Sequence, residues 1–366
     1  MRVVHLAPFY HPVIGGVEEV VKRIAEYMAS KGNEVYVVTY NRLRVSGVGS
    51  LPKEEVINNV NVIRLKPNFT WSHGTYSNEL PKTVERIIPD LVHVHVWRHP
   101  HVFQAIKLRE KLNYKTLLHT HAPFHTLSQL GLITWLYYKA IDWSKSGFLG
   151  RYDNLLTLTP HERAILVKQL GAREDKVAIV PNGIDDEFVI SAQDKVGADP
   201  MVLYLGRISR SKNVGLLIKA MRYVNKEISN VKLVLAGPDE GFVANLRKFE
   251  VSFKYLGVVS ETEKCRLLSE CTVFAHPASY EPFGITLLEA QAFGKPCVIT
   301  GNGGQRYVAP PETSLYAKPN PEDFGRAILS LLNDKELYRK LSLKAKEWAS
   351  KHSWSKILPI YDEIYS

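Results

Sequence analysis

The chain has 366 residues and three cysteines, with 45% hydrophobic residues, 23% charged residues and a formal net charge of +10. This length predicts two domains, and this composition is typical of a globular protein. The sequence has no apolar run of about 18 residues, which argues against a membrane-spanning helix. Three cysteines without a C-x-x-C pair argue against a disulfide framework and favour a reducing cytoplasm. The positive charge is not accompanied by a zinc finger, an RNP string or a basic zipper, so we expect no nucleic-acid partner.

A strand, a glycine turn and a helix open the chain. Residues 3–6 form a short apolar run, Gly15 and Gly16 follow, and apolar residues then recur at helical spacing. A second strand at 34–40 completes a βαβ unit. Glycines at a helix start let the backbone approach an anion, although a glycine pair alone is more often a simple tight turn. The dinucleotide fingerprint G-x-G-x-x-G is absent here.

Two apolar strands of the first half carry histidines at their ends. His93 and His95 lie on one face of the strand at 91–96, and the strand at 116–121 ends with His119 and His121. Such histidines are usually core residues. The two pairs also suggest a metal site, but no carboxylate or cysteine joins them at ligand spacing. We therefore expect no metal ligands in this chain.

The segment 98–151 is basic and becomes aromatic toward its end. It contains eight Lys or Arg residues against two acidic residues. Aromatic and basic side chains together are typical of a helix at a membrane surface. They are equally typical of a helix packed on a sheet with a solvated charged face, so both interpretations stay open.

A polar stretch at 186–200 predicts the linker between two domains. The second domain opens with a strand at 201–205 and a loop that carries Arg207 and Lys212. Positively charged side chains in a loop usually contribute only to the solubility of the protein. This loop, however, follows a strand, and in a parallel sheet such loops gather where ligands bind. There Arg can grip a phosphate with two hydrogen bonds, and Lys can act as a point charge.

Residues 274–304 give the clearest pattern: strand, loop, helix, strand and glycine-rich loop. Glu281 precedes the helix and Glu289 lies inside it, about 10–12 Å further along the helical rise. The helix start offers N–H groups that suit a phosphate, those of Phe283, Gly284, Ile285 and Thr286. An anion at the helix tip with a carboxylate on each side for hydroxyls matches a nucleotide sugar. On spacing alone, two solvated glutamates on an amphipathic helix are the commoner explanation.

The complete string E-P-F-G-I-T-L-L-E-A at 281–290 resembles the E-x7-E signature of retaining glycosyltransferases of the GT-B fold, specifically glycosyltransferase family 4. The opening P-x-Y-x-P-x-x-G-G-x-E and the string P-N-G-I-D at 181–185 are similar to further motifs of that family. The resemblance therefore covers nearly the whole chain.

The resemblance implies an α/β protein of two doubly wound, Rossmann-like domains that face a cleft. Residues 1–185 would form the acceptor domain and 186–352 the nucleotide-sugar domain, and a final helix at 353–366 would pack back on the first. The implied activity is transfer of a hexosyl group from a UDP- or GDP-sugar with retention, without a cofactor. Because no Asp-x-Asp motif is present, a metal-independent route is favoured.

Roles follow from the resemblance residue by residue. Glu281 would hold sugar hydroxyls near the reacting carbon, and Glu289 would hold the ribose. His121, with His119 as second choice, would help to position the sugar. The diphosphate would meet Arg207, Lys212, the amides of Gly15 and Gly16, and the helix start at 283–286, while the backbone near Val258 would meet the nucleobase.

The resemblance has two gaps, at 41–80 and 305–312. In the first we predict a strand at 60–65 and a loop at 71–77. In the second, relatives usually carry Gly-Gly-x-x-Glu, whereas Gly303-Gly304 is followed here by Gln305, Arg306 and Tyr307. Any contact that the acidic residue makes in relatives is missing here.

Other classes stay open beside a transferase. A nucleotide-dependent oxidoreductase shares the fold elements but needs the fingerprint that this chain lacks. A sugar-nucleotide 2-epimerase or a non-catalytic nucleotide-sugar binder would use the same fold. For a transferase the acceptor would be a sugar or a lipid-linked molecule. We expect a cytoplasmic protein, and the membrane interpretation of the basic aromatic segment would add a peripheral contact at the inner face of the membrane.

Overall fold

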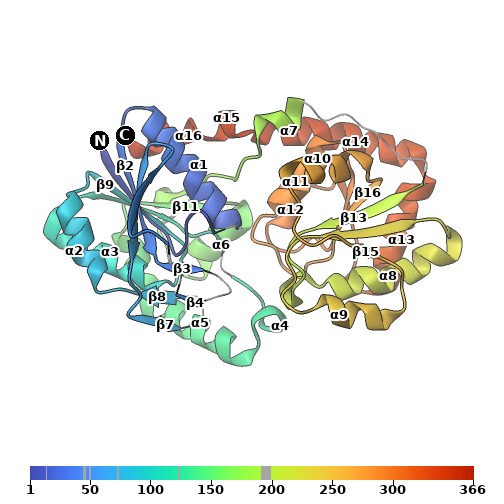
Figure 1. Cartoon of the computed structure of the whole chain (residues 1–366), viewed down its shortest axis with the longest axis horizontal. Helices are drawn as coiled ribbons and strands as arrows, with labels where there is room; N and C mark the ends of the chain where they lie inside the picture. Colours follow the sequence, from blue (N-terminus) through green and yellow to red (C-terminus); the bar gives the residue numbers. More distant parts are fainter. Residues whose placement is uncertain (14, 44–46, 49–50, 72–73, 123, 191–198) are drawn as a thin grey trace. The chain divides into compact units, whose positions relative to one another are not determined.

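The computed structural model describes residues 1–366 except 14, 44–46, 49–50, 72–73, 123 and 191–198. The chain divides into two compact α/β units, which are treated separately (Figure 1). Unit 1 comprises Met1–Phe124, Leu132–Pro181 and Ile357–Ser366. Unit 2 comprises His125–Gly131 and Asn182–Lys356.

These units differ from the expected domains in three short segments. Residues 182–185 and 353–356 belong to unit 2, although the sequence analysis placed both with the first domain. Residues 125–131 also belong to unit 2, where the Gln129 amide donates to the backbone oxygens of Ser211 at 3.1 Å and Tyr280 at 2.9 Å. Apolar periodicity does not reveal such side-chain contacts.

The sheet of unit 1 has eight strands in the order β12-β11-β10-β9-β1-β2-β6-β5, and all neighbours are parallel except β5 and β6. The strands are β1 (Arg2–Leu6), β2 (Glu34–Tyr40), β5 (Glu54–Ile57), β6 (Val60–Leu65), β9 (Leu91–His95), β10 (Lys115–His119), β11 (Asn154–Thr157) and β12 (Val177–Ile179). The chain first places β2 on one side of β1 and later places β9 on the other side. Ligands of open α/β sheets bind where the strand order reverses in this way.

Register places histidines side by side on this sheet. His5 of β1 lies opposite His93 of β9, and His95 of β9 lies opposite His119 of β10. Alternate residues of a strand share one face, so these four side chains lie on the same face of the sheet. All four are fully buried.

The helices of unit 1 are α1 (Gly16–Ser30), α2 (Glu79–Ile87), α3 (Pro100–Leu112), α5 (Leu132–Lys145), α6 (Pro160–Lys168) and α16 (Ile360–Tyr365). The expectation of one helix at the end of the chain was wrong, because α15 (Trp354–Ile357) and α16 are separate. Pro359 lies between them and cannot continue a helix that begins before it. The red α16 lies against α1 of unit 1 in Figure 1, where the Tyr27 hydroxyl donates to Asp362 at 2.7 Å.

Residues 41–80 contain more regular structure than the sequence indicated. The strand predicted at 60–65 is confirmed as β6. The loop predicted at 71–77 was wrong in part, because β7 (Phe69–Trp71) and β8 (Gly74–Tyr76) form an antiparallel hairpin. The remaining short strands, β3 (Arg42–Leu43) and β4 (Gly47–Val48), pair with each other.

The sheet of unit 2 is fully parallel, with the order β15-β14-β13-β16-β17-β18. Its strands are β13 (Met201–Leu205), β14 (Lys232–Ala236), β15 (Lys254–Tyr255), β16 (Val273–His276), β17 (Cys297–Ile299) and β18 (Ser314–Tyr316). The order reverses between β13 and β16. The loops that follow these two strands therefore meet at the edge where a ligand is expected.

The helices of unit 2 are α4 (Leu127–Leu130), α7 (Asp186–Ile190), α8 (Val214–Glu227), α9 (Val243–Leu246), α10 (Glu261–Glu270), α11 (Ile285–Ala292), α12 (Gln305–Val308), α13 (Pro321–Asn333), α14 (Lys335–Ala349) and α15. Side chains of β13, β14 and β16 pack with those of α8 and α13 in one apolar core. Because this core fixes the strands, the loops at their carboxyl ends rest on a rigid base.

Candidate functional site

A buried ion pair lies where the strand order of unit 2 reverses. Glu281 comes from the loop after β16, and Lys212 ends a 3-10 turn (Arg210–Lys212) after β13. The Lys212 ammonium donates to Oε2 of Glu281, and Nε2 of His276 lies 3.1 Å from the same oxygen. The side chains of Lys212 and Glu281 are only 16% and 11% exposed. Two residues predicted from separate loops are thus in direct contact.

Electrostatics keep Glu281 ionised. Burial alone would raise the pKa of its carboxyl group, but the charge of Lys212 and the hydrogen bond from His276 hold that pKa well below its usual range. The carboxylate therefore remains a hydrogen-bond acceptor at neutral pH. His276 was not among the predicted site residues, although its place at the end of β16 was a signal for it.

Two glycines hold the backbone of Glu281 in place. Gly304 donates its N–H to the Glu281 carbonyl at 2.7 Å, and Gly303 pairs with Glu281 as an isolated parallel bridge. A Cβ on Gly304 would lie 2.0 Å from the Pro282 oxygen, and one on Gly303 would lie 2.7 Å from the Glu281 oxygen. Any side chain at these positions would push the Glu281 loop away.

The helix after Glu281 begins as an anion site would require. Gly284, at a φ of 95°, precedes α11, which runs from Ile285 to Ala292. The first N–H groups of a helix have no partner within it and lie at the positive end of its dipole. Phe283 and Gly284 are buried, whereas Ile285 and Thr286 are half-buried. The predicted donors therefore lie at a partly accessible helix start.

Glu289 is also buried and paired. Its Oε1 accepts from the Lys264 ammonium at 2.7 Å, and Lys264 pairs with Glu261 at the same distance. Burial raises the pKa of Glu289, and Lys264 opposes that shift. Among the described residues, Oε2 of Glu289 has no hydrogen-bond partner. Sequence reasoning missed Lys264, because nothing in the local pattern of α10 indicates a partner 25 residues away.

The structure does not bring Arg207 into this ion pair. Its guanidinium instead pairs with Glu240 at 3.0 Å, and the two side chains are 50% and 47% exposed. Val258 is 66% exposed in the loop after β15. Its neighbour Gly257 accepts a hydrogen bond from Gly237 at 2.7 Å, which ties that loop to the end of β14. Both predicted residues lie at the surface of unit 2.

Gln305 and Arg306 organise the glycine-rich loop. Oε1 of Gln305 accepts from the N–H groups of Gly301 at 2.8 Å and Asn302 at 3.2 Å. Arg306 donates to the Gly301 oxygen at 2.8 Å. Tyr307 stands where relatives were expected to carry the acidic residue, and the two residues before it, Gln305 and Arg306, fix the loop packed on Glu281.

In unit 1 the predicted Gly15 and Gly16 lie where α1 begins. The Gly15 oxygen accepts from the Glu19 N–H at 3.0 Å, in the first turn of the helix. This turn follows β1, next to the point where the strand order of unit 1 reverses. The glycines therefore lie at the ligand-binding edge expected for this sheet.

His121 lies in a strained turn that a buried glutamate holds. Its φ is 55°, which is unusual for a residue with a side chain. Glu162, at the start of α6, accepts from the Thr120 hydroxyl, the Ala122 N–H and, at 2.6 Å, the Leu158 N–H. Sequence reasoning missed Glu162, although Thr159-x-x-Glu162 has the form of a capping box.

A chain of imidazoles extends from His121 into unit 1. Nε2 of His121 lies 3.0 Å from Nδ1 of His95, and Nε2 of His95 lies 3.0 Å from Nδ1 of His5. Burial lowers the pKa of each of these three rings, so all three are neutral at pH 7. His5 was not predicted as a site residue, because a single histidine in an apolar strand gives no functional signal.

An apolar surface of unit 1 combines α5 with the β7–β8 hairpin. Trp71 packs edge-on against Tyr137 with ring centroids 6.4 Å apart. The exposed apolar residues of this surface are Phe69, Trp71, Tyr76, Leu132, Ile133, Leu136, Tyr137 and Trp143. Within the described residues, none of the helices has the length and apolar character to cross a membrane.

Comparison with family models covers most of the chain. Residues 14–188 match the model described as Glycosyltransferase Family 4, and residues 185–348 match the model described as Glycosyl transferases group 1. An uncharacterized glycosyltransferase of Methanocaldococcus jannaschii is 27% identical over 399 residues, which cover 100% of this chain and 98% of that relative.

Solved structures share the fold. Sucrose-phosphate synthase from Thermosynechococcus elongatus superimposes with a TM-score of 0.78 at 20% identity, covering 100% of this chain and 98% of the other. HepE of Anabaena, solved in complex with UDP and glucose, gives a TM-score of 0.77 at 17% identity over 99% and 98%. The predicted GT-B fold of Rossmann-like α/β units is confirmed.

Proposed function

The chain belongs to glycosyltransferase family 4, and from that premise we propose that it moves a hexosyl group from a UDP- or GDP-sugar to an acceptor with retention at the anomeric carbon. The observation that carries this proposal is the buried Lys212–Glu281 pair beside the start of α11. A cation, a helix start and an ionised carboxylate suit a diphosphate and the hydroxyls of its sugar.

A different carboxylate would accept hydrogen bonds from each end of the donor. Glu281 would accept hydrogen bonds from hydroxyls near the reacting carbon, with His121 helping to position the sugar. Glu289 would accept from the ribose, and its Oε2, which has no hydrogen-bond partner within the part of the chain that the structure describes, supports this role. The backbone near the exposed Val258 would contact the base. HepE, whose structure contains UDP and glucose, is consistent with a donor of this class.

The chemistry would rest mainly on charge stabilisation. As the bond between the anomeric carbon and the diphosphate oxygen breaks, negative charge grows on the leaving diphosphate. Lys212, Arg207, the amides of Gly15 and Gly16 and the start of α11 would stabilise that charge. The acceptor oxygen would bond to the same face of the carbon, and its proton would pass to the departing phosphate oxygen. A cation contact of about 4 kcal/mol felt only in the transition state corresponds to roughly 10³ in rate.

A ligand screen followed by product analysis tests this function. A nucleoside diphosphate at a hundred times its dissociation constant should add about 2.7 kcal/mol to the stability of the native protein. With the donor so identified, NMR of the product should show the donor's anomeric configuration. A product of inverted configuration contradicts retention, and an epimerised sugar nucleotide without transfer supports the 2-epimerase alternative.

We further propose that the acceptor is reached at an anionic membrane surface and is lipid-linked. Trp143 is 88% exposed and Ile133 is 79% exposed on α5, which also carries Lys139 and Lys145. Aromatic residues suit the headgroup region, and each Lys near anionic lipid contributes about 1 kcal/mol. A sugar acceptor free in solution is the competing proposal.

Vesicle sedimentation over a salt series tests the membrane proposal. Anionic vesicles should bind the protein, neutral vesicles should bind less, and salt should weaken the binding. Lys139→Glu with Lys145→Glu should reduce binding, whereas the control pair Lys335→Glu with Lys340→Glu, on α14 of unit 2, should not. A lack of binding at low salt favours the soluble acceptor.

A further inference from the structure

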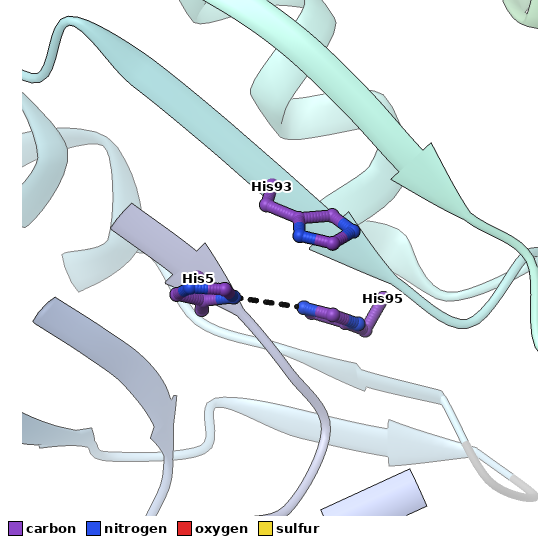
Figure 2. A group of neighbouring side chains, drawn as sticks. All are labelled: His5, His93 and His95. Carbon is purple, nitrogen blue, oxygen red and sulfur yellow. Dashed lines mark hydrogen bonds between the residues drawn. The ribbon is translucent and has the colours of Figure 1, made fainter. Parts of the chain in front are cut away.

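Three histidines of unit 1 converge from two neighbouring strands. His5 extends from β1, and His93 and His95 extend from β9 toward it (Figure 2). One ring nitrogen from each residue lies within 4.8 Å of the other two. All three side chains have no exposed surface. Three potential nitrogen ligands are therefore held together in the interior of the unit.

The edge-to-edge contact of His5 and His95 already has nearly the spacing of two ligands on one ion. Nδ1 of His5 and Nε2 of His95 are 3.0 Å apart, and their ring planes differ by only 17°. Zinc binds imidazole nitrogen at about 2.0–2.1 Å with tetrahedral angles, which places two such nitrogens about 3.3 Å apart. A small separation of the two rings would admit the ion.

His93 supplies the third nitrogen and an anchored ring. Its Nδ1 lies 2.7 Å from the Tyr365 hydroxyl. Among the described residues, its Nε2 has no hydrogen-bond partner despite full burial. Buried polar atoms are rarely left without a partner. If Nδ1 donates its hydrogen to Tyr365, Nε2 carries the lone pair that a metal ligand needs.

We propose that Nδ1 of His5, Nε2 of His93 and Nε2 of His95 bind one divalent transition-metal ion of the zinc class. From the sequence we expected no metal site, because no carboxylate or cysteine joins the histidines at ligand spacing. Three imidazoles alone are a known zinc ligand set, so a site does not need those residues. The ion would join β1 to β9 beneath α16. None of its three ligands is among the residues proposed above to contact the diphosphate.

A second group, His95, His119 and His121, competes for the same ion. The rings of His119 and His121 stack face to face, with centroids 4.0 Å apart and planes 20° from parallel. Ligand lone pairs lie in the ring plane, so stacked rings do not direct them to one point. The rings of His93 and His95 are about as close, with centroids 4.1 Å apart, but their planes are tilted by 35° rather than stacked. Ring orientation thus favours the group with His5, although both ring nitrogens of His119 also have no hydrogen-bond partner among the described residues.

Metal titration of the untagged full chain tests the proposal. After removal of metal by a chelator, the wild-type protein should bind one equivalent of Zn²⁺ in calorimetry. With Co²⁺ it should show the strong visible absorption of a tetrahedral site, and its Tm should rise with the metal concentration. These wild-type measurements do not depend on the folding of any variant. No stoichiometric binding at micromolar free metal overturns the proposal.

Variants locate the site. His5→Gln and His93→Gln should each lower Zn²⁺ affinity by about 100-fold or more, and Tyr365→Phe should lower it by roughly 10-fold. His352→Gln, at a buried histidine of unit 2, should bind Zn²⁺ as the wild type does. Binding that is lost in His119→Gln but kept in His5→Gln overturns the assignment to His5, His93 and His95.

Discussion

Removal of one charge at Glu281 should stop transfer without removing the nucleotide. Glu281→Gln keeps the shape of the side chain but weakens its contact with Lys212 and with sugar hydroxyls. We expect kcat to fall by at least about 100-fold, with an unchanged Kd for the nucleoside diphosphate in calorimetry. Glu263→Gln, at an exposed pair with Arg266, is the control. Near-normal turnover in Glu281→Gln would remove this residue from the proposed site.

Lys212 and Arg207 should differ when each is changed to Ala. Lys212→Ala leaves the buried Glu281 without its main counter-charge, so we expect a loss of about 3 kcal/mol of stability as well as of kcat/KM. Arg207→Ala breaks a half-exposed pair with Glu240, which typically contributes less than about 1 kcal/mol. Denaturant unfolding and kinetics measure both quantities. Equal losses of stability would contradict the difference in burial on which the prediction rests.

Glu289 should affect donor binding more than the chemical step. Ribose contacts persist from the ground state to the transition state, so Glu289→Ala should raise the donor KM with little change in kcat. Lys264→Met, which removes the partner of Glu289, should act in the same direction. Steady-state kinetics over a range of donor concentrations measure this. An unchanged KM with a collapsed kcat would reverse the roles of Glu281 and Glu289.

At the scale of the element, the glycine-rich loop after β17 supports the loop of Glu281. Gly304→Ala would place a Cβ on the Pro282 oxygen, and we expect a loss of about 1–3 kcal/mol from overpacking together with weaker donor binding. Gly215→Ala is the matched control in unit 2, because its Cβ would meet Phe249 at an ordinary 3.6 Å within α8. Thermal unfolding should show no loss for the control. Equal stability of the two variants would refute the support role.

Individual strands, helices and buried side-chain pairs show which features of the fold and of the site could be predicted from the sequence. Apolar strands such as β6 and β13, and the loops after them, follow from local pattern alone. The pairs Lys264–Glu289 and Glu162–Thr120 could not be predicted, because each joins positions distant in the chain through tertiary packing. The break at Pro359 was a local signal that the prediction of one final helix overlooked. The hairpin of β7 and β8 was missed because its strands are too short to show periodicity.

At the scale of the whole molecule, deletion of residues 358–366 should destabilise unit 1. Tyr361 and Tyr365 are each 1% exposed, and burial of a large apolar side chain contributes about 1.5–3 kcal/mol. We expect unit 1 to lose about 3–6 kcal/mol and transfer to fall with it, in denaturant unfolding and activity assays. The control Glu363→Gln changes an exposed residue of the same helix. Wild-type stability and activity of the truncated protein would refute this prediction.

The return of α16 to unit 1 also fixes an order of events during synthesis. The strands of unit 1 leave the ribosome before the strands of unit 2, but the tyrosines that cover His93 emerge only after unit 2. At about 5–20 residues per second, the face of the sheet that carries the histidines stays uncovered for roughly ten to forty seconds. Unit 1 is therefore translated first but completed last, and during that interval nascent chains should be most vulnerable to proteases and to aggregation.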